Sequence, residues 1–281
     1  MGIRVLKPNT NAQRGMSYLD NVDITAKKPT VKRLLKVGRK VNGRNNGKIS
    51  IRHRGGGTRR QYRMVDFKGT DKLGIPAKIT TIEYDPNRTV NIALLVFADG
   101  EKRYVLAWKG ATVGETVVTD IKAKAIDGNR MQIENIPVGF HIFNLEVKLN
   151  KGGQFIRSAG QYGKLISLDG DMAQVELRSG EIRLVPKKCF ATIGTLGNEE
   201  WSLVRIGKAG RVRNSGRRPQ VRGKVMNPID HPHGGGEAAN SIGMKYPKTP
   251  WGAHALGVKT RKKNKTSNKF ILKSRHRAKK K

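Results

Sequence analysis

The chain has 281 residues, 36% of them hydrophobic, and a formal net charge of +36. This apolar fraction is low for a single globule. No run approaches the ~20 apolar residues of a membrane span. The single cysteine, Cys189, excludes a disulfide within the chain and a cysteine-based zinc site. Residues 1–60 hold 16 Lys and Arg against 2 Asp and Glu, residues 201–281 hold 22 against 2, and the residues between them hold 19 against 17. We therefore expect the middle to fold alone in water and the cationic flanks to need a large polyanion, for which nucleic acid fits because each phosphate contact releases counterions.

Residues 1–60 are predicted to form a long, irregular, basic N-terminal extension. Their composition buries too little apolar surface to offset the entropy of ordering, so we expect this segment to become ordered on its partner. Arg4 and Lys7 interrupt the apolar start, which argues against a signal-peptide core and favours the cytoplasm. Further on, Asn42–Gly47 has the composition of a turn, and the alternation in Lys48–Arg52 predicts a short strand.

A triple glycine, Gly55–Gly57, stands among arginines near the end of this extension. It resembles a phosphate cradle but lacks the Lys-Ser/Thr ending of a nucleotide-binding loop. It is either a flexible linker or a place where bare backbone approaches a sugar-phosphate chain while the flanking arginines contact phosphates, and we favour the second. The candidate RNA-binding residues of this part of the chain are Arg44, Arg52, His53, Arg54, Gly55, Gly56, Gly57, Arg59, Arg60 and Arg63.

From Tyr62 onward, short β-rich runs recur at a spacing of roughly ten residues, which is typical of a small barrel or sandwich. We assign this first module to residues 61–130. Its pair Asn91–Phe97 and Lys102–Leu106, joined through Asp99-Gly100, predicts a hairpin. The expected strands are Tyr62–Phe67, Ala77–Tyr84, Val90–Phe97, Lys102–Leu106 and a run around Val117.

A second β series follows a predicted linker at Asn135–Gly139, and we assign it to residues 131–200. Cys189 is expected to be buried in it, as free cysteines usually are. The expected strands are His141–Lys148, Gly163–Leu168, Met172–Leu177, Ile182–Val185 and Cys189–Ile193. Two successive five-strand modules of this size are too small for sandwiches, and small closed barrels of the OB or SH3-like kind fit the count.

Residues 201–281 are predicted to form a long, irregular, basic C-terminal extension. Residues 201–209 are expected to form one short helix, and no long amphipathic helix is expected in the chain. Arginines gather after this helix, and arginine favours planar, bidentate contacts with phosphate and stacking on bases. The end of the chain is rich in lysine, which suits looser neutralisation of charge. The candidate RNA-binding residues here are Arg211, Arg213, Arg217, Arg218, Arg222, Lys224, Arg261, Lys262 and Lys263.

The most specific string of the chain is Asn227–Glu237, with two histidines, an aspartate and a glutamate. A metal site is disfavoured because no further cluster of ligands is evident, and we predict no metal ligand. A general base at His231 or His233 needs a substrate pocket, and this loop lies outside both modules. We favour a third interpretation, in which Asp230, His231 and His233 hydrogen-bond within the loop and to RNA, with Asn227 as a further RNA-binding candidate.

Trp251 follows Thr249-Pro250 in the C-terminal extension and is also a candidate RNA-binding residue. It either stacks on a base or packs against the core. RNA is preferred to DNA as the polyanion because the chain offers no recognition helix for a major groove. Compaction of chromosomal DNA, or a general nucleic-acid chaperone activity, is the alternative.

Several strings together resemble the family of universal large-subunit ribosomal proteins conventionally numbered two, in its bacterial type. They are Gly43–Gly47, Ile51–Gly57, Asp85–Arg88, Met131–Gly139, Asn227–Glu237 and Thr249–Gly252. The resemblance covers about residues 3–275. It implies an OB-like RNA-binding barrel at residues 61–130, an SH3-like barrel at residues 131–200, and basic extensions threaded into ribosomal RNA.

The same resemblance implies a structural constituent of the large ribosomal subunit. Such a protein is a primary rRNA binder near the peptidyl-transfer centre and supports subunit association and tRNA binding. The expected partners are large-subunit rRNA, neighbouring ribosomal proteins and the small subunit, with the chain a monomer within the cytoplasmic ribosome and without a membrane. We expect no enzymatic activity and no cofactor apart from RNA-associated magnesium. Members of the family have been proposed to assist peptide-bond formation through a histidine of this loop, which leaves His231 and His233 as candidate general bases.

Overall fold

The chain folds into two compact units, each built from segments that lie far apart in the sequence. The computed structural model describes residues 2–38, 42–237 and 241–275. The first unit, called here the barrel unit, comprises Met1–Arg39, Arg59–Lys208 and Lys269–Lys281. The second, called here the arm unit, comprises Lys40–Thr58 and Ala209–Asn268. Both predicted extensions therefore contribute to both units.

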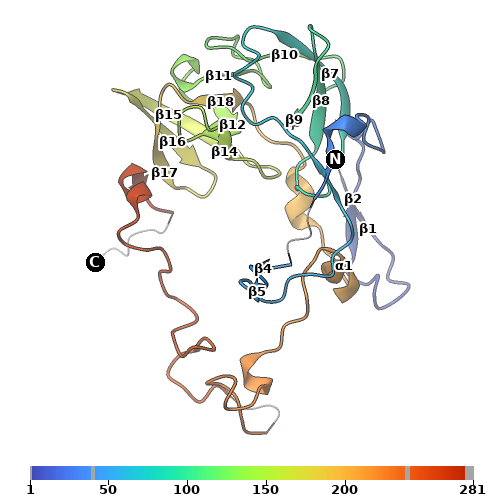
Figure 1. Ribbon diagram of the computed structural model, residues 1–281, viewed down its shortest axis with the longest axis vertical. Helices are drawn as coiled ribbons and strands as arrows, with labels where there is room; N and C mark the ends of the chain where they lie inside the picture. The colour runs from blue at the N-terminus through green and yellow to red at the C-terminus, as the bar shows by residue number, and fades with distance from the viewer. Residues whose placement is uncertain (1, 39–41, 238–240, 276–281) are drawn as a thin grey trace. The chain divides into compact units, whose positions relative to one another are not determined.

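The first β module is a four-stranded antiparallel sheet in the order β10-β7-β8-β9 (Figure 1). Its strands are β7 (Pro76–Glu83), β8 (Ile92–Phe97), β9 (Lys102–Leu106) and β10 (Thr116–Val118). Four of the five predicted strands are thus confirmed, and the expected hairpin is β8–β9, turned by Gly100 at a φ of 82°. Alternate apolar residues of the strands, such as Ile79 and Leu95, are buried in one core with Trp108.

The other predicted strand of this module, Tyr62–Phe67, is shorter than expected and pairs elsewhere. It forms β6 (Gln61–Arg63), whose partner is β3 (Leu35–Val37) in the N-terminal segment. The chain turns soon afterwards because Oδ1 of Asp66 accepts hydrogen bonds from the backbone N–H groups two and three residues further on. The partner strand lies far away in sequence, so local periodicity could not predict this pairing.

The N-terminal segment covers one face of the first sheet. Val31 and Leu34 pack against a small cluster that contains Tyr104, which is fully buried. The buried carboxylate of Glu83 accepts a hydrogen bond from the Tyr104 hydroxyl at 2.9 Å and another from the backbone N–H of Thr30 at 3.1 Å. We therefore expect the barrel unit to be less stable without these residues. The other regular elements of this segment are β1 (Ile3–Val5), β2 (Ser17–Leu19) and the 3-10 helix η1 (Lys32–Leu34).

The second β module is a seven-stranded antiparallel sheet in the order β11-β18-β12-β15-β16-β17-β19. Its strands are β11 (Arg130–Gln132), β12 (His141–Phe143), β15 (Gly163–Asp169), β16 (Met172–Leu177), β17 (Ile182–Pro186), β18 (Phe190–Ile193) and β19 (Ile271–Lys273). All five predicted strands of this series are present, although His141–Lys148 is interrupted at Asn144, whose φ of 47° is left-handed. The chain continues there as β13 (Leu145–Glu146), which pairs with β14 (Gly153–Phe155).

The predicted linker at Asn135–Gly139 is wrong. The preceding strand β11 pairs with β18, and the 3-10 helix η2 (Ile133–Asn135) follows β11 directly. Ile133 and Ile136 are buried in the core of the second sheet. The Pro and Gly of this segment therefore mark a turn inside the second module, and the boundary expected between residues 130 and 131 falls within β11.

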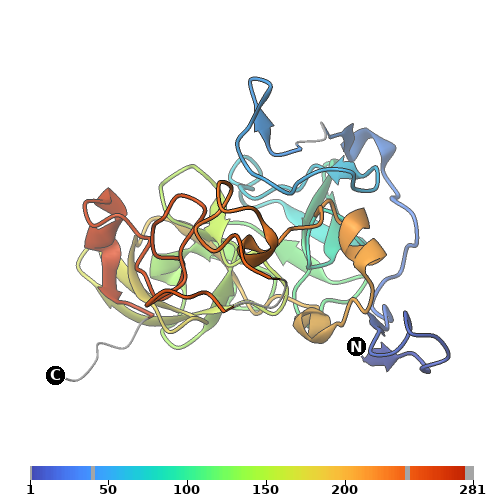
Figure 2. The same ribbon diagram turned by 90° about the horizontal axis from the view of Figure 1, so that it is seen from below.

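Strand β19 attaches the C-terminal segment to the edge of the second sheet. Ile271 pairs with Arg183 and Lys273 pairs with Ile182 in β17. Figures 1 and 2 show this red segment beside the yellow strands. Residues 209–268 therefore leave the barrel unit at one point and return to it at another.

The helix predicted at residues 201–209 is also wrong. The 3-10 helix η3 (Glu199–Leu203) covers only the first three residues of this span, and the helix α1 (Ala209–Asn214) begins at its last residue. Between them the chain is extended, because the backbone N–H of Ser17 donates to the carbonyl of Arg205 at 3.0 Å and the N–H of Arg205 donates to Oγ of Ser17 at 2.8 Å. Across the described ranges α1 is the sole α-helix, and no helix has the length and apolar character needed to cross a bilayer.

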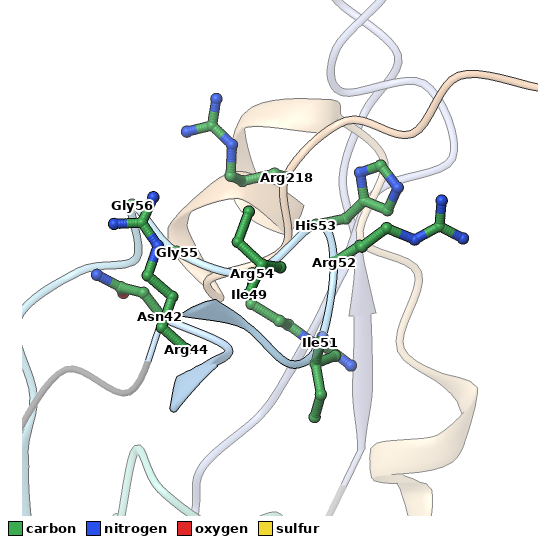
Figure 3. Close-up of a pocket in the computed structure, with 10 residues that line it drawn as sticks. All are labelled: Asn42, Arg44, Ile49, Ile51, Arg52, His53, Arg54, Gly55, Gly56 and Arg218. Carbon is green, nitrogen blue, oxygen red and sulfur yellow. The ribbon is translucent and has the colours of Figure 1, made fainter. Parts of the chain in front are cut away.

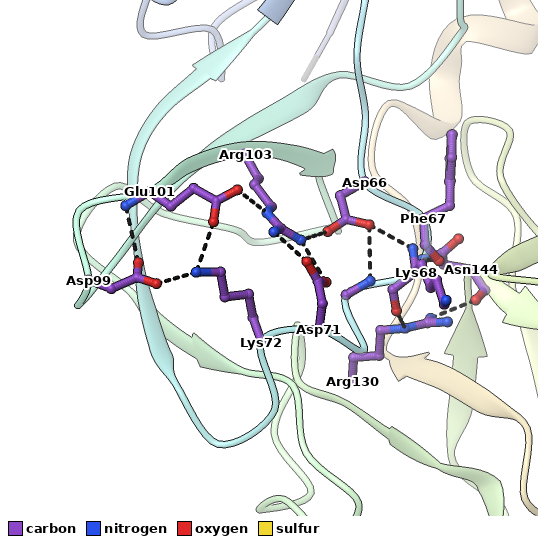
Figure 4. Close-up of polar contacts among 11 residues, drawn as sticks. Asp66, Phe67, Lys68, Asp71, Lys72, Asp99, Glu101, Arg103, Arg130 and Asn144 are labelled. Carbon is purple, nitrogen blue, oxygen red and sulfur yellow. Dashed lines mark hydrogen bonds and ion pairs between the residues drawn. The ribbon is translucent and has the colours of Figure 1, made fainter. Parts of the chain in front are cut away.

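An ion-pair network stiffens the loops at one end of the first sheet (Figure 4). The guanidinium of Arg103 donates hydrogen bonds to Asp66 at 2.7 Å, to Asp71 at 2.6 and 2.8 Å, and to Glu101 at 2.9 Å. The other carboxylate oxygen of Glu101 lies 2.8 Å from Nζ of Lys72. The hydrogen bond from Arg103 lowers the pKa of Asp71 to about 2.

Arg130 connects the two β modules within the barrel unit. Its Nε donates to the carbonyl of Lys68 at 3.1 Å, and its Nη1 donates to the carbonyl of Asn144 at 2.8 Å (Figure 4). Burial lowers the pKa of this guanidinium to about 10. Phe143 and Leu196 from the second module also lie in the core of the first. The two modules therefore share both polar and apolar contacts, which explains why they form one unit.

Candidate nucleic-acid interface

The arm unit brings together the two cationic clusters that the sequence presents separately. The backbone N–H of Gly55 donates to the carbonyl of Gly216 at 2.9 Å, that of Thr58 to Asn214 at 2.9 Å, and that of Arg218 to His53 at 3.0 Å. Arg54 and Arg217 also form an antiparallel bridge. We call this pairing of residues 53–58 with residues 214–218 the arm ladder. It places arginines from both flanks of the chain on one short stretch of structure.

Glycine makes the arm ladder possible. A Cβ atom at Gly57 would lie 3.0 Å from the Cα of Gly216, tighter than ordinary side-chain packing permits. Gly55 has a φ of 128°, which L-residues rarely adopt. In this structure the triple glycine lets the backbone approach a second segment of the protein closely. The hydrogen bonds of the arm ladder argue against a flexible linker at these residues. A contact with RNA at these glycines stays a prediction.

Positive charge dominates the arm unit. Its two segments hold 18 Lys and Arg against 2 Asp and Glu, whereas 19 of the 21 acidic residues of the chain belong to the barrel unit. A folded surface with this balance attracts polyanions strongly and repels other cationic surfaces. The barrel unit holds the other 39 Lys and Arg beside its 19 acidic residues, so it is not neutral. The arm unit differs from it in having almost no acidic residues to offset its cations.

Most predicted RNA-binding residues lie in the arm unit, and three do not. Arg59, Arg60 and Arg63 belong to the barrel unit. Arg60 donates from Nη1 to the carbonyl of Pro86 at 2.9 Å. Arg63 is only 8% exposed and donates from Nη1 to the carbonyl of Gln61 at 3.0 Å. Arg63 therefore stabilises the fold in this structure, because burial removes it from the surface that RNA would contact.

The arm unit contains Arg44, Arg52, His53, Arg54, Gly55, Gly56, Gly57, Arg211, Arg213, Arg217, Arg218, Arg222, Lys224, Asn227, His231, His233, Trp251, Arg261, Lys262 and Lys263. Lys262 and Lys263 are exposed, as expected for loose charge neutralisation. Arg261 instead donates from Nε to Oδ1 of Asn268 at 2.6 Å and so helps to fold its own segment. The lysines at residues 279–281 lie outside the described residues.

A pocket of about 590 Å³ lies in the arm unit beside the hairpin of β4 (Arg44–Asn45) and β5 (Lys48–Ile49) (Figure 3). The hairpin turns at Asn46 and Gly47, whose φ values of 48° and 75° confirm the predicted turn. Seven of the ten lining residues are among the predicted RNA-binding residues. The other three, Asn42, Ile49 and Ile51, were not predicted, because in this segment only the cationic residues and the triple glycine were considered. The alternation of β-branched residues within a cationic segment was the sequence signal that could have identified Ile49 and Ile51 as pocket residues.

Trp251 lies on the surface at the tip of a turn and not in a core. Its side chain is 79% exposed. The turn is closed by a hydrogen bond from the backbone N–H of Thr249 to the carbonyl of Ala253 at 2.7 Å. The guanidinium carbon of Arg52 lies 5.0 Å from the centroid of the Trp251 ring, within the range of a cation–π contact. Packing against the core is thus excluded for this residue, and stacking on a base stays a prediction.

The histidine loop is a compact, internally hydrogen-bonded turn. His231 is 7% exposed, and its Nδ1 accepts a hydrogen bond from the backbone N–H of His233 at 3.0 Å. Nε2 of His233 accepts one from the backbone N–H of Lys248 at 2.9 Å. Glycine makes room for this arrangement, because a Cβ at Gly223 would lie 2.5 Å from the His231 ring and one at Gly234 would lie 2.3 Å from the carbonyl oxygen of Asn227.

These contacts limit what the histidines can do chemically. A neutral imidazole has one acceptor nitrogen, and in both residues a backbone N–H occupies it. A general base needs that lone pair for the substrate's proton. Within the ranges that the structure describes, no group of three or more His, Cys, Asp or Glu residues is arranged to hold a metal ion. The hydrogen bonds of His231 and His233 agree with the part of the third interpretation that expected contacts within the loop, and its contacts with RNA stay a prediction.

The remaining regular elements of the arm unit are short. They are the 3-10 helices η4 (Gly223–Val225) and η5 (Thr266–Phe270), the second of which continues into the barrel unit. The unit therefore holds most of its cations on turns and loops, although Arg211 and Arg213 lie on the short helix α1. Irregular cationic backbone suits the varied surface of a folded RNA better than the regular groove of a duplex.

Two family models match the chain. The model described as Ribosomal Proteins L2, RNA binding N-terminal domain, matches residues 31–119, and the model described as Ribosomal Proteins L2, C-terminal domain, matches residues 126–252. Together they cover more than half of the chain. They agree with an OB-like barrel followed by an SH3-like barrel, and the second match extends through the histidine loop to Gly252.

Proposed function

Because this chain belongs to the ribosomal protein L2 family, we propose that it stabilises large-subunit rRNA near the peptidyl-transfer centre and supports subunit association and tRNA binding. Membership of the family makes the chain a structural ribosomal protein that binds RNA, located in the ribosome. The observation that carries the proposal is the arm unit, where two cationic segments are locked together by the arm ladder. Such a unit neutralises phosphates that would otherwise keep RNA helices apart.

We also propose the partners and location that go with this function. They are neighbouring ribosomal proteins and the small subunit, with a single copy of the chain in a cytoplasmic ribosome. The chain needs no cofactor of its own, and magnesium associated with the RNA is the metal ion we expect near Asp230 and Glu237.

We propose that the chain does not itself catalyse a reaction. The support is the engaged acceptor nitrogens of His231 and His233. The substitution His233→Gln retains an acceptor oxygen near the position of Nε2, whereas His233→Ala does not. We expect ribosomes that carry His233→Gln to form peptide bonds at the normal single-turnover rate. A loss of roughly 10²–10⁴-fold in properly assembled particles would instead support general-base catalysis.

The salt dependence of rRNA binding tests the main proposal. If the arm unit contacts six or more phosphates, the association constant of the full chain should fall at least about 10³-fold between 50 and 200 mM salt. The double variant Arg217→Gln, Arg218→Gln removes two cations of the arm ladder, and the slope of log K against log salt should become shallower by about 1.8. The matched control is Lys102→Gln, Lys164→Gln, which removes two exposed cations of the barrel unit.

A nearly flat salt dependence in the unmodified chain would contradict electrostatic RNA binding. Equal loss of slope in the control would show that the arm unit has no special part in it. Binding of duplex DNA as tightly as rRNA at the same salt concentration would favour general compaction of nucleic acid over a ribosomal role.

A further inference from the structure

The pocket of Figure 3 combines guanidinium groups with apolar side chains in a way that phosphate binding does not require. Ile49 is 63% exposed and Ile51 is 57% exposed, and both line the pocket. Leaving a β-branched apolar side chain in water is unfavourable, and a polar residue would serve a surface that only neutralises phosphates. The two isoleucines therefore indicate that the occupant has an apolar face.

The backbone holds these isoleucines in place before any partner arrives. The carbonyl of Gly43 accepts hydrogen bonds from the backbone N–H groups of Ser50 at 2.8 Å and Ile51 at 2.9 Å. Oγ of Ser50 donates to the same carbonyl at 3.0 Å. A Cβ at Gly43 would lie 2.2 Å from the carbonyl oxygen of Ile51, so this close fold requires glycine. A backbone held in this way lowers the ordering cost of binding to that of the side chains around the pocket.

The rim of the pocket selects for negative charge. Arg44, Arg52, Arg54 and Arg218 line it, together with His53, and none of its ten lining residues is acidic. In Figure 3, Arg52 and His53 lie on one side of Ile49 and Arg44 lies on the other. An occupant must therefore carry anionic groups on more than one side of an apolar centre.

Two further groups favour a nucleobase as that centre. The amide of Asn42 lines the pocket and can both donate to and accept from a base edge. The guanidinium carbon of Arg52 lies 5.0 Å from the centroid of the Trp251 ring, and a guanidinium group can also stack on a base. The volume of about 590 Å³ lies in the ordinary range of sites that enclose a small molecule.

We propose that this pocket takes one unpaired RNA nucleotide, with its base against Ile49 and Ile51 and its flanking phosphates against the surrounding arginines. The inference rests on the proposed function, because it names the feature of the RNA that the arm unit recognises. A paired base cannot enter such a pocket, so the site is expected to read a bulge, a loop or a strand end.

The test compares two RNAs that have equal charge. One is a hexaadenylate, and the other has the same backbone with abasic riboses at all six positions. We expect the full chain to prefer the RNA with bases by roughly 5- to 150-fold, the range that corresponds to stacking one base. The double variant Ile49→Ser, Ile51→Ser keeps every charge, so it should lose this preference and keep its affinity for the abasic RNA. The matched control is Ile229→Ser, an exposed isoleucine of the arm unit outside the pocket, which should keep the preference.

The outcomes separate this inference from the function on which it rests. A steep salt dependence for both RNAs without any preference for bases overturns the pocket assignment and leaves the RNA-binding function standing. A flat salt dependence for both overturns the function as well. A preference that persists in the double variant overturns the assignment, because bases then bind elsewhere. Competition by a hexaglutamate peptide that equals competition by hexaadenylate, and disappears in the double variant, would assign the pocket to an acidic protein segment and overturn the nucleotide proposal.

Discussion

Arg103 holds the loops of the first β module together, and the substitution Arg103→Met tests how much this network contributes. Its hydrogen bond to Asp66 is well sheltered, because the two side chains are 17% and 18% exposed. A charged hydrogen bond of this kind contributes about 1.5–3 kcal/mol. Its bonds to Asp71 reach a side chain that is 60% exposed and contribute about 0.2–1 kcal/mol, and its bond to the exposed Glu101 adds little. We therefore expect a loss of about 2–4 kcal/mol in the free energy of unfolding.

The assay is thermal unfolding of the full chain at pH 7, followed by fluorescence of the buried Trp108 in the first core. For a unit of this size 1 kcal/mol corresponds to about 2–4 °C, so the melting temperature of Arg103→Met should fall by about 5–15 °C. The matched control is Lys72→Met, whose partners Asp99 and Glu101 are 36% and 44% exposed. Because these ion pairs are exposed to solvent, the melting temperature of Lys72→Met should fall by less than that of Arg103→Met. A fall of less than 2 °C in Arg103→Met would refute the assignment of a stabilising role to this network.

The pH dependence adds a second check with a defined sign. The pKa of Asp71 is lowered from 3.8 to about 2 by Arg103, so its contribution to stability is present above pH 3.8 and is lost as the pH falls through about 2. The difference in melting temperature between the unmodified chain and Arg103→Met should be constant from pH 7 to pH 4.5 and should shrink below pH 4. A difference that keeps its full size at pH 2 would show that the network does not act through ionised carboxylates.

Three further substitutions or reactions have defined outcomes. Gly234→Ala places a methyl group 2.3 Å from the carbonyl oxygen of Asn227, so hydrogen exchange should show lost protection in the histidine loop while the barrel unit melts normally. Gly57→Val should open the arm ladder at Gly216. We expect weaker rRNA binding and a shallower slope of log K against log salt, with an unchanged melting temperature of the barrel unit. Unchanged rRNA binding would contradict the role of the arm ladder. Cys189 is fully buried, so a thiol reagent should react with it only as the chain unfolds. Burial raises the pKa of the Cys189 thiol from 9.0 to about 12. The free energy of unfolding should therefore decrease as the pH rises from 9 towards 12, because the thiol of the unfolded chain ionises first. Rapid labelling of the folded chain at pH 8 would contradict its burial.

Local sequence patterns predicted the strands of both modules well. β9 (Lys102–Leu106) and β16 (Met172–Leu177) begin and end at the expected residues, because alternation and flanking turns define them within a few residues of chain. The pairings that failed or were missed involve distant partners. β6 pairs with β3, and β17 pairs with β19. The periodicity of apolar residues within a strand does not indicate which distant segment will pair with it.

Charge identified many of the residues that the arm unit brings together, but it did not predict how that unit is built. The arginines of residues 52–54 and 217–218 were identified, yet their pairing in the arm ladder depends on backbone hydrogen bonds that composition does not reveal. Arg63 was included for its charge although it is buried, since charge alone does not report burial. Ile49 was left out for its lack of charge although it lines the pocket.

The short ladder between β17 and β19 has a consequence for the order of ribosome assembly. While β19 is paired with β17, residues 209–268 form a closed loop whose two ends are both attached to the barrel unit. A closed loop has no free end that could pass through a narrow gap in RNA that has already folded. If residues 209–268 are threaded into rRNA, as the resemblance implies, either the RNA must close around this segment or the three residues of β19 must detach first and pair with β17 again afterwards. So short a ladder opens far more readily than the barrels unfold, which makes β19 a natural latch for late insertion.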